Sequence, residues 1–152
     1  MQVFVPYRTP LECAAQLDPR RRNKQIIECR QILAAIRGES NAWRNHPCVK
    51  MYASHVEWLE YYMFCLECYS LFMLANEKDC EDLFLQAYDY SQDAKPLTPD
   101  FLTEEFCIQH RRRLYTKDNN FYRDFAMYGE SSANWYFVNG ELWKYANGKR
   151  IN

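Results

Sequence analysis

Charged side chains crowd a stretch of the sequence that begins at residue 18. Its polar members are Asp18, Arg20, Arg21, Arg22, Lys24, Gln25, Glu28, Arg30 and Gln31. A carboxylate among arginines stays ionised near neutral pH, so it can move protons or stabilise a cation while its neighbours hold phosphate. The alternative is an exposed helix end whose charges pair at spacings of three and four residues. The stretch is either an anion-binding face centred on a carboxylate or an ordinary solvated surface.

A second candidate anion site is the run W-R-N-H-P at residues 43–47. His46-Pro47 predicts a helix start, and the free N–H groups at a helix N-terminus attract anions. Arg44 and His46 are therefore candidate phosphate ligands, unless Asn45 or His46 simply caps the helix. His55 is a further candidate two turns along, although a lone histidine in a helix more often has a structural role.

Other motifs exclude several kinds of site. Cys65-Leu66-Glu67-Cys68 is a C-x-x-C sequence in an apolar stretch with no second pair at zinc-finger spacing, which favours core cysteines over a metal site. The glycine-rich patterns of P-loop, Rossmann and α/β-hydrolase proteins do not occur in the sequence. We therefore expect no metal and no cofactor.

The net charge of -1 conceals a strong segregation. Residues 1–55 carry a balance of +5, residues 56–108 a balance of -10, and residues 109–152 a balance of +4. Both ends of the chain can contribute to one basic face that binds a polyanion, and Arg111-Arg112-Arg113 either joins that face or ends a helix favourably. The acidic segment 77–93 is a candidate partner surface.

The elements that position these residues are predicted to be mainly helical. Capping residues, prolines and glycines predict helices over residues 10–16, 19–37, 47–74, 81–90 and 99–113, with a linker at 91–98. In the second helix, Ile26, Cys29, Leu33 and Ile36 form the predicted apolar stripe. Arg21, Lys24, Glu28 and Gln31 are predicted to lie on the opposite face.

Asn139-Gly140 between two aromatic runs predicts a β-hairpin at the C-terminal end. The expected architecture is a compact, mainly α helical bundle of one domain, residues 1–152, with a small C-terminal β-hairpin. The sequence has no stretch long and apolar enough for a membrane span and no secretory signal. Its seven cysteines are expected to be reduced and buried, as in a cytoplasmic protein. We also expect a monomer.

Several of these residues together resemble a known family. They are Phe4, Pro6, Tyr7, Leu17-Asp18, Arg21, Lys24-Gln25, Glu28, Gln31-Ile32 and the run Trp43-Arg44-Asn45-His46-Pro47. This pattern is similar to small bacterial and phage proteins grouped with the phage-type pyrimidine-dimer DNA glycosylase/AP lyases, which are endonuclease V-like. The resemblance covers about residues 1–70. The resemblance to the characterised glycosylase itself is distant. It includes a proline followed eight residues later by His-Val, which here are Pro47 and His55-Val56.

The resemblance implies a small α-helical DNA-repair enzyme that kinks damaged or modified duplex DNA and flips a nucleotide. The N-terminal α-amine would attack the sugar of a damaged pyrimidine and form an imine, which permits strand cleavage by β-elimination. Glu28 matches the glutamate that assists proton transfers, and Arg21, Arg22 and Arg30 match phosphate-holding residues. Because Gln2 is bulky, we expect Met1 to be retained as the amine donor.

The candidate catalytic residues are Met1, Gln2 and Glu28. The candidate DNA- or phosphate-binding residues are Arg21, Arg22, Lys24, Gln25, Arg30, Arg44, His46 and His55. Two alternatives to an enzyme remain open: a non-catalytic nucleotide- or nucleic-acid-binding protein that retains the fold and the anionic pocket, and an interaction protein that uses the acidic segment. The chain departs from the family in charge, since a repair enzyme of this type is expected to be strongly basic.

Overall fold

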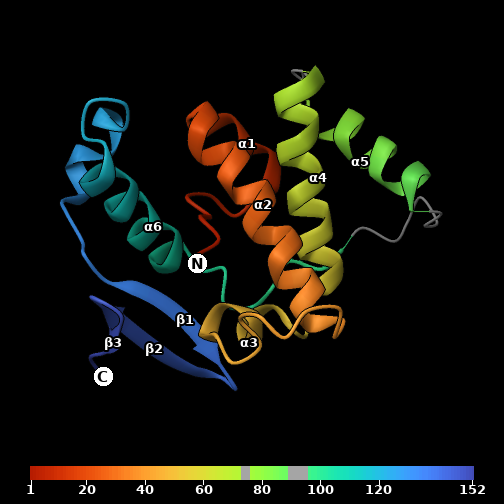
Figure 1. The fold of residues 1–152 in the computed structure, drawn as a ribbon. Coiled ribbons are helices and arrows are strands. Elements are labelled where there is room, and N and C mark those ends of the chain that lie inside the picture. The colour runs from red at the N-terminus through yellow and green to blue at the C-terminus, as the bar shows by residue number, and fades with distance from the viewer. Residues whose placement is uncertain (73–75, 89–95) are drawn as a thin grey trace.

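A computed structural model describes residues 1–72, 76–88 and 96–152 of the chain. Their fold is mainly α with a small antiparallel sheet at the C-terminal end, as the sequence predicts (Figure 1). The elements in chain order are α1 (Pro10–Gln16), α2 (Pro19–Ile36), α3 (Pro47–Tyr52), α4 (Val56–Phe72), α5 (Glu77–Ala87), α6 (Glu104–Lys117), the 3-10 helix η1 (Arg123–Tyr128), β1 (Asn134–Val138), β2 (Glu141–Ala146) and β3 (Lys149–Arg150).

The first two helices begin and end where the sequence predicts. Each has proline in its first turn, where a missing N–H costs nothing. The side chain of Asp18 caps α2 by accepting from the Arg21 N–H at 3.0 Å. The predicted capping box of α1 does not form, because the Thr9 hydroxyl bonds to the Glu12 carboxylate instead of to a backbone N–H.

The predicted long helix over residues 47–74 is wrong. It is divided into α3 and α4 by a turn at residues 53–55, where the His55 N–H bonds to the Tyr52 carbonyl at 2.9 Å. The turn lets α3 pack beneath β1 while α4 packs against α1 and α2. It also brings the rings of Tyr52 and Trp58 into a stacked pair, with centroids 6.1 Å apart. No glycine or proline marks this break, and the predicted end at residue 74 lies outside the described residues.

Two later helix starts also differ from the prediction. The helix expected from Pro99 begins at Glu104, because Thr103 accepts from the Phe106 N–H and caps α6. The helix expected over residues 81–90 begins at Glu77, after Asn76 accepts from the Asp79 N–H at 2.8 Å. The rest of that prediction and most of the predicted linker fall on residues 89–95, outside the described residues.

The predicted β-hairpin is confirmed. β1 and β2 pair antiparallel around Asn139 and Gly140, which have φ values of 53° and 80°, the positive pair that a type I′ turn requires. Asn147 and Gly148 repeat this turn, with φ values of 50° and 76°, and lead into the short strand β3. β3 and η1 were not predicted.

The N-terminal segment runs through the middle of the molecule, between α2 and α6 (Figure 1). Residues 2–5 are buried although they form no regular strand. Tyr62 of α4 donates to the Phe4 carbonyl at 2.6 Å. His110 of α6 accepts from the Val5 N–H at 3.1 Å, and its neighbour Arg111 donates to the Pro6 carbonyl at 2.7 Å. α4 and α6 therefore hold this segment from two sides.

The seven cysteines are free and buried, as predicted. Both sulfurs of the C-x-x-C sequence lie on α4, and Cys65 Sγ is 3.0 Å from Cys80 Sγ of α5. This contact helps to join α5 to the rest of the fold. Within the described ranges, none of the helices has the length and apolar character needed to cross a membrane.

The buried His110 predicts an acid-sensitive fold. Burial, followed by the nearby charge of Arg113, lowers its pKa to about 3, against 6.5 in an unfolded chain. Between these values the unfolded chain binds a proton that the folded chain does not, so the free energy of unfolding falls as pH falls. His110→Gln, which keeps an acceptor for the Val5 N–H, should shrink the loss between pH 7 and pH 5 by about 2 kcal/mol in denaturant titrations. An unchanged pH dependence would contradict this assignment.

Candidate active site

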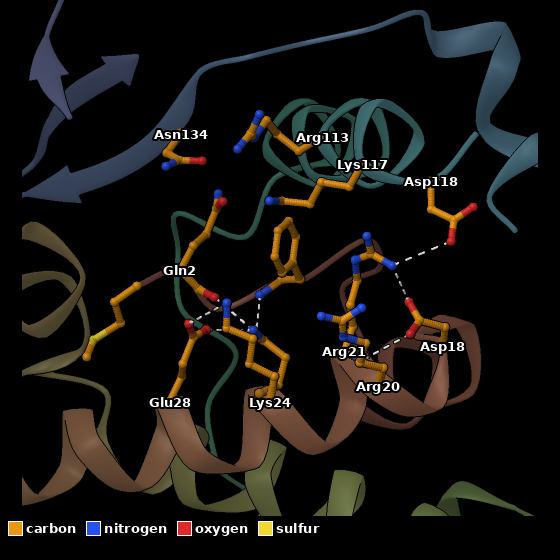
Figure 2. Close-up of a pocket in the computed structure, with 13 residues that line it drawn as sticks. Gln2, Asp18, Arg20, Arg21, Lys24, Glu28, Arg113, Lys117, Asp118 and Asn134 are labelled. Carbon is orange, nitrogen blue, oxygen red and sulfur yellow. Dashed lines mark hydrogen bonds and ion pairs between the residues drawn. The ribbon is translucent and has the colours of Figure 1, made fainter. Parts of the chain in front are cut away.

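A pocket of about 460 Å³ opens where the N-terminal segment, α2 and α6 meet (Figure 2). It is lined by Met1, Gln2, Phe4, Asp18, Arg20, Arg21, Lys24, Gln25, Glu28, Arg113, Lys117, Asp118 and Asn134. Six of the predicted site residues are therefore together in one pocket: Met1, Gln2, Arg21, Lys24, Gln25 and Glu28. The pocket is of the size that small-molecule and nucleotide sites usually have.

The side chain of Gln25 connects the N-terminal segment to α2. Its Oε1 accepts from the Phe4 N–H at 2.7 Å, and its Nε2 donates to the Gln2 carbonyl at 2.9 Å. The same Nε2 donates to Glu28 Oε2 at 2.8 Å. The amide is 1% exposed, so these bonds form away from water. Gln25 thus fixes the first residues of the chain and the glutamate relative to one another.

The sequence places Glu28 on the polar face of α2, but in the structure this carboxylate is not exposed to solvent. It is 9% exposed, and with Gln25 it is buried on the side of α2 that the N-terminal segment covers. Periodicity could not reveal this, because the covering segment is not itself a regular element. Lys24 approaches from the solvent side, with its Nζ 3.8 Å from Glu28 Oε1. Glu28 is therefore a shielded carboxylate with one oxygen held by Gln25 and the other beside a cation.

Met1 is positioned by the C-terminal sheet. Tyr136 of β1 donates to the Met1 carbonyl at 2.9 Å. His46 lies close to the α-amine: burial, followed by the positive charge of that amine, lowers the pKa of His46 to about 4. Its ring packs edge-on against Tyr136, with centroids 5.6 Å apart, and its Nδ1 accepts from the Cys48 N–H to cap α3. His46 thus has the capping role and flanks the N-terminus, but it does not line the pocket.

Arg113 and Lys117 of α6 supply cations to the pocket from the side opposite α2 (Figure 2). Burial lowers the pKa of Lys117, and the charges of Arg113, Arg21 and Lys24 lower it further. Arg113 and Lys117 are four residues apart, so the sequence places both on one face of a helix. This spacing does not by itself show that the face lines a pocket. The sequence contains the basic run at 111–113, but nothing in it indicates which of the three arginines faces the N-terminus.

One end of the pocket is closed by a network around Asp18. Arg21 Nη1 lies 2.7 Å from Asp18 Oδ2 and 3.8 Å from Asp118 Oδ2. Tyr122 also donates to Asp18 at 2.7 Å. Burial raises the pKa of Asp18, but the bonds from Arg21 and Tyr122 outweigh it and hold the pKa below its ordinary value. Arg21 is therefore largely neutralised, whereas Arg113 and Lys117 have no carboxylate within ion-pair distance among the described residues.

Two of the predicted phosphate ligands on α2 point elsewhere. Arg22 donates to the carbonyls of Ala14 and Leu17, at 2.8 and 2.7 Å, and so joins α1 to α2. Arg30 forms an ion pair with Glu67 of α4 at 2.7 Å, on the outer side of the helix. Neither side chain lines the pocket.

Two further candidates lie in other parts of the fold. Arg44 is exposed in the loop before α3. His55 lines a separate cavity of about 490 Å³ together with Asp100, and its ring packs against Phe101 at a centroid distance of 5.3 Å. The structure therefore does not bring Arg44, His46 and His55 together with the charged stretch of α2 in the pocket.

The pocket combines a primary amine, a shielded carboxylate and several cations. A neutral amine can attack an electrophilic carbon, a carboxylate can transfer the protons and stabilise a cationic intermediate, and the cations can bind phosphate. These groups are all supplied by the side chains and the N-terminus of this chain.

Comparison with known proteins agrees with this geometry. Residues 1–68 match the family described as pyrimidine dimer DNA glycosylase. This range contains the N-terminal segment and α2, so it includes Met1, Gln25 and Glu28. Neither a curated protein nor a solved structure matches the chain. Over residues 1–68, the match confirms the relationship to the pyrimidine dimer DNA glycosylase family that the sequence motifs indicate.

Proposed function

We propose that the chain is a DNA glycosylase/AP lyase that excises a damaged or modified pyrimidine through an imine on its N-terminal amine. The family match suggests pyrimidine dimer DNA glycosylase activity, which implies DNA as substrate. The observation that supports the proposal most strongly is that Met1 and Glu28 line the same pocket and that Gln25 connects their two segments. From the sequence we also infer one domain acting as a cytoplasmic monomer.

The α-amine of Met1 is the proposed nucleophile. Its nitrogen forms a bond to C1′ of the sugar as the bond from C1′ to the base breaks, and the base leaves with that electron pair and takes up a proton. Retention of Met1 suits this chemistry. If Gln2 were the first residue, its α-amine could attack the side-chain carbonyl and expel ammonia, which would leave a lactam nitrogen that is not nucleophilic.

Glu28 is the proposed proton-transfer group. Loss of the base and opening of the sugar yield a protonated imine, whose positive charge a nearby carboxylate stabilises. Removal of a proton from C2′ then expels the 3′ phosphate by β-elimination, and water releases the amine. Gln25 leaves Glu28 Oε1 on the side of Lys24, so one carboxylate oxygen stays available for the proton.

The cations of α6 are the proposed phosphate ligands. Arg113 and Lys117 lie across the pocket from Glu28 (Figure 2), and we assign to them the phosphates that flank the reacting sugar. This arrangement also suits the alternative, a protein that binds a nucleotide or nucleic acid without catalysis. Sodium borohydride distinguishes the two, because it reduces an imine to a stable covalent adduct on abasic DNA only if the imine forms.

Glu28→Gln should lower strand cleavage and borohydride trapping at abasic DNA at least about 100-fold, the usual contribution of a general acid–base group. The new amide still offers an oxygen to Gln25, so the free energy of unfolding should change by no more than about 1 kcal/mol. Binding to duplex DNA should persist. Gel assays of cleavage and denaturant titrations measure these quantities.

The matched control is Glu67→Gln. It removes the same charge from the partner of Arg30 on the outer side of α2 and should leave cleavage near the wild-type rate. Equal loss in both variants, or full activity of Glu28→Gln, would count against the role of Glu28.

DNA binding should weaken steeply with salt if the pocket holds phosphates. The slope of log K against log salt is about -0.9 per phosphate neutralised, so Arg113→Ala and Lys117→Ala should each make the slope shallower by about one. Arg30→Ala, which removes a cation outside the pocket, should leave the slope unchanged. Fluorescence anisotropy with a labelled duplex measures all four proteins. No binding even at low salt would contradict a nucleic-acid substrate.

A further inference from the structure

The side chain of Gln2 has no role in the scheme above, yet it is buried in the pocket. Gln2 is 6% exposed, and neither its Oε1 nor its Nε2 has a hydrogen-bond partner in the described part of the chain. Only the backbone carbonyl of this residue is used, by Gln25. A buried amide with both polar atoms unpaired costs stability, so native proteins rarely retain one without a use.

Unpaired polar atoms from two other elements accompany this amide. Asn134 Oδ1 of β1 and Arg113 Nε of α6 are likewise buried without a hydrogen-bond partner within the described residues. Asn134 is two residues before Tyr136, whose hydroxyl donates to the Met1 carbonyl. In Figure 2 the Gln2 side chain extends away from α2 and towards the side of the pocket formed by Asn134, Arg113 and Lys117.

The pocket therefore has two chemically different sides. Next to α2, Lys24 and Arg21 pair with the carboxylates of Glu28 and Asp18. On the side of Arg113 and Lys117, the Gln2 amide and Asn134 Oδ1 add a neutral donor and neutral acceptors that are unpaired within the described part of the chain. Charged groups suit a phosphate and a cationic sugar, whereas an unpaired primary amide suits a ligand that has a donor and an acceptor side by side.

We propose that the Gln2 amide, supported by Asn134 Oδ1, recognises the Watson–Crick edge of a pyrimidine at N3 and position 4. This inference rests on the proposed function, because it assigns the base that leaves the sugar to the amide side of the pocket. A pyrimidine presents an adjacent donor and acceptor at N3 and position 4, and a primary amide pairs with both at once, as it does with adenine in DNA grooves. Rotation of the amide by half a turn fits either the carbonyl or the amino form of position 4.

Access to Gln2 requires a side chain to move. Both amide atoms have almost no exposed surface in the empty pocket, and Lys117 and Arg113 line the same side. Lys117 is exposed and long, so it can rotate without displacement of the backbone, whereas Arg113 Nη1 donates to the Ser131 carbonyl at 3.1 Å. A phosphate that draws Lys117 outward would uncover the amide. Recognition of the base is then coupled to binding of its nucleotide and not of the free base.

The test is a comparison of two ligands and two proteins by calorimetric or NMR titration. The ligands are thymidine 5′-monophosphate and its N3-methyl derivative, which lacks the N3 donor and blocks this edge. Wild-type protein should bind the unmodified nucleotide about tenfold more tightly, the size expected for one bidentate base contact. Gln2→Met, which keeps the length of the side chain and removes its polar atoms, should reduce this ratio to about one. Gln31→Met, the same change at an exposed position of α2, should retain the wild-type ratio.

Thermal unfolding of Gln2→Met gives a second and independent readout. If the amide is unpaired in the free protein, an apolar chain of equal length should not lower the melting temperature. A marked decrease would show that the amide has a structural partner and would overturn the proposal. The proposal also fails if wild-type protein binds neither nucleotide, if it shows no preference, or if Gln2→Met keeps the preference.

These outcomes are separable from the failure of the proposed function. Nucleotide binding requires no imine, whereas borohydride trapping at an abasic site requires no base. Borohydride trapping without a preference for the unmodified nucleotide would support the lyase activity and rule out base recognition by Gln2. An N3 preference without trapping would support base recognition in a protein that binds nucleotides without catalysis.

Discussion

The hydrogen bonds of the Gln25 amide are the interaction on which the candidate site depends. One buried side chain binds the Phe4 N–H, the Gln2 carbonyl and Glu28, so it sets the position of the N-terminus and the carboxylate together. An N-terminus is usually the most mobile part of a chain, and a nucleophile must be held within a short distance of the reacting carbon. Gln25 resolves this conflict by fixing the backbone at Gln2 and Phe4, the first and third residues after the one that bears the amine.

The rest of the fold extends the same constraint along residues 1–6. This segment is buried without a neighbouring strand, and a buried backbone without hydrogen bonds would be strongly destabilising. Its partners are side chains from three directions: Tyr136 of the sheet, Tyr62 of α4, and His110 and Arg111 of α6. The C-terminal sheet and α6 are therefore required to build a site whose first residues belong to the family-matched region.

The sequence predicts the elements better than their contacts. The prolines and Asp18 locate α1 and α2, and Asn139-Gly140 locates the hairpin, because these signals act within a few residues. The division between α3 and α4 escapes prediction, since it depends on packing against β1 and not on a local breaker. Arg30 and Glu28 illustrate the same limit for the site. These residues are two positions apart on α2. Arg30 forms an outer ion pair, whereas Glu28 is buried in the pocket because the N-terminal segment covers its side of the helix.

The measurement that tests the account most directly is the position of the covalent adduct after borohydride reduction with abasic DNA. Proteolysis and tandem mass spectrometry of the adduct identify the amine that formed the imine, and intact mass first establishes whether the chain retains Met1. The account predicts the sugar fragment on the α-amine of Met1, with no adduct after acetylation of that amine. An adduct on Lys24 or Lys117, the lysines that line the pocket, would show that the imine forms on another nucleophile and would contradict the central role of the fixed N-terminus.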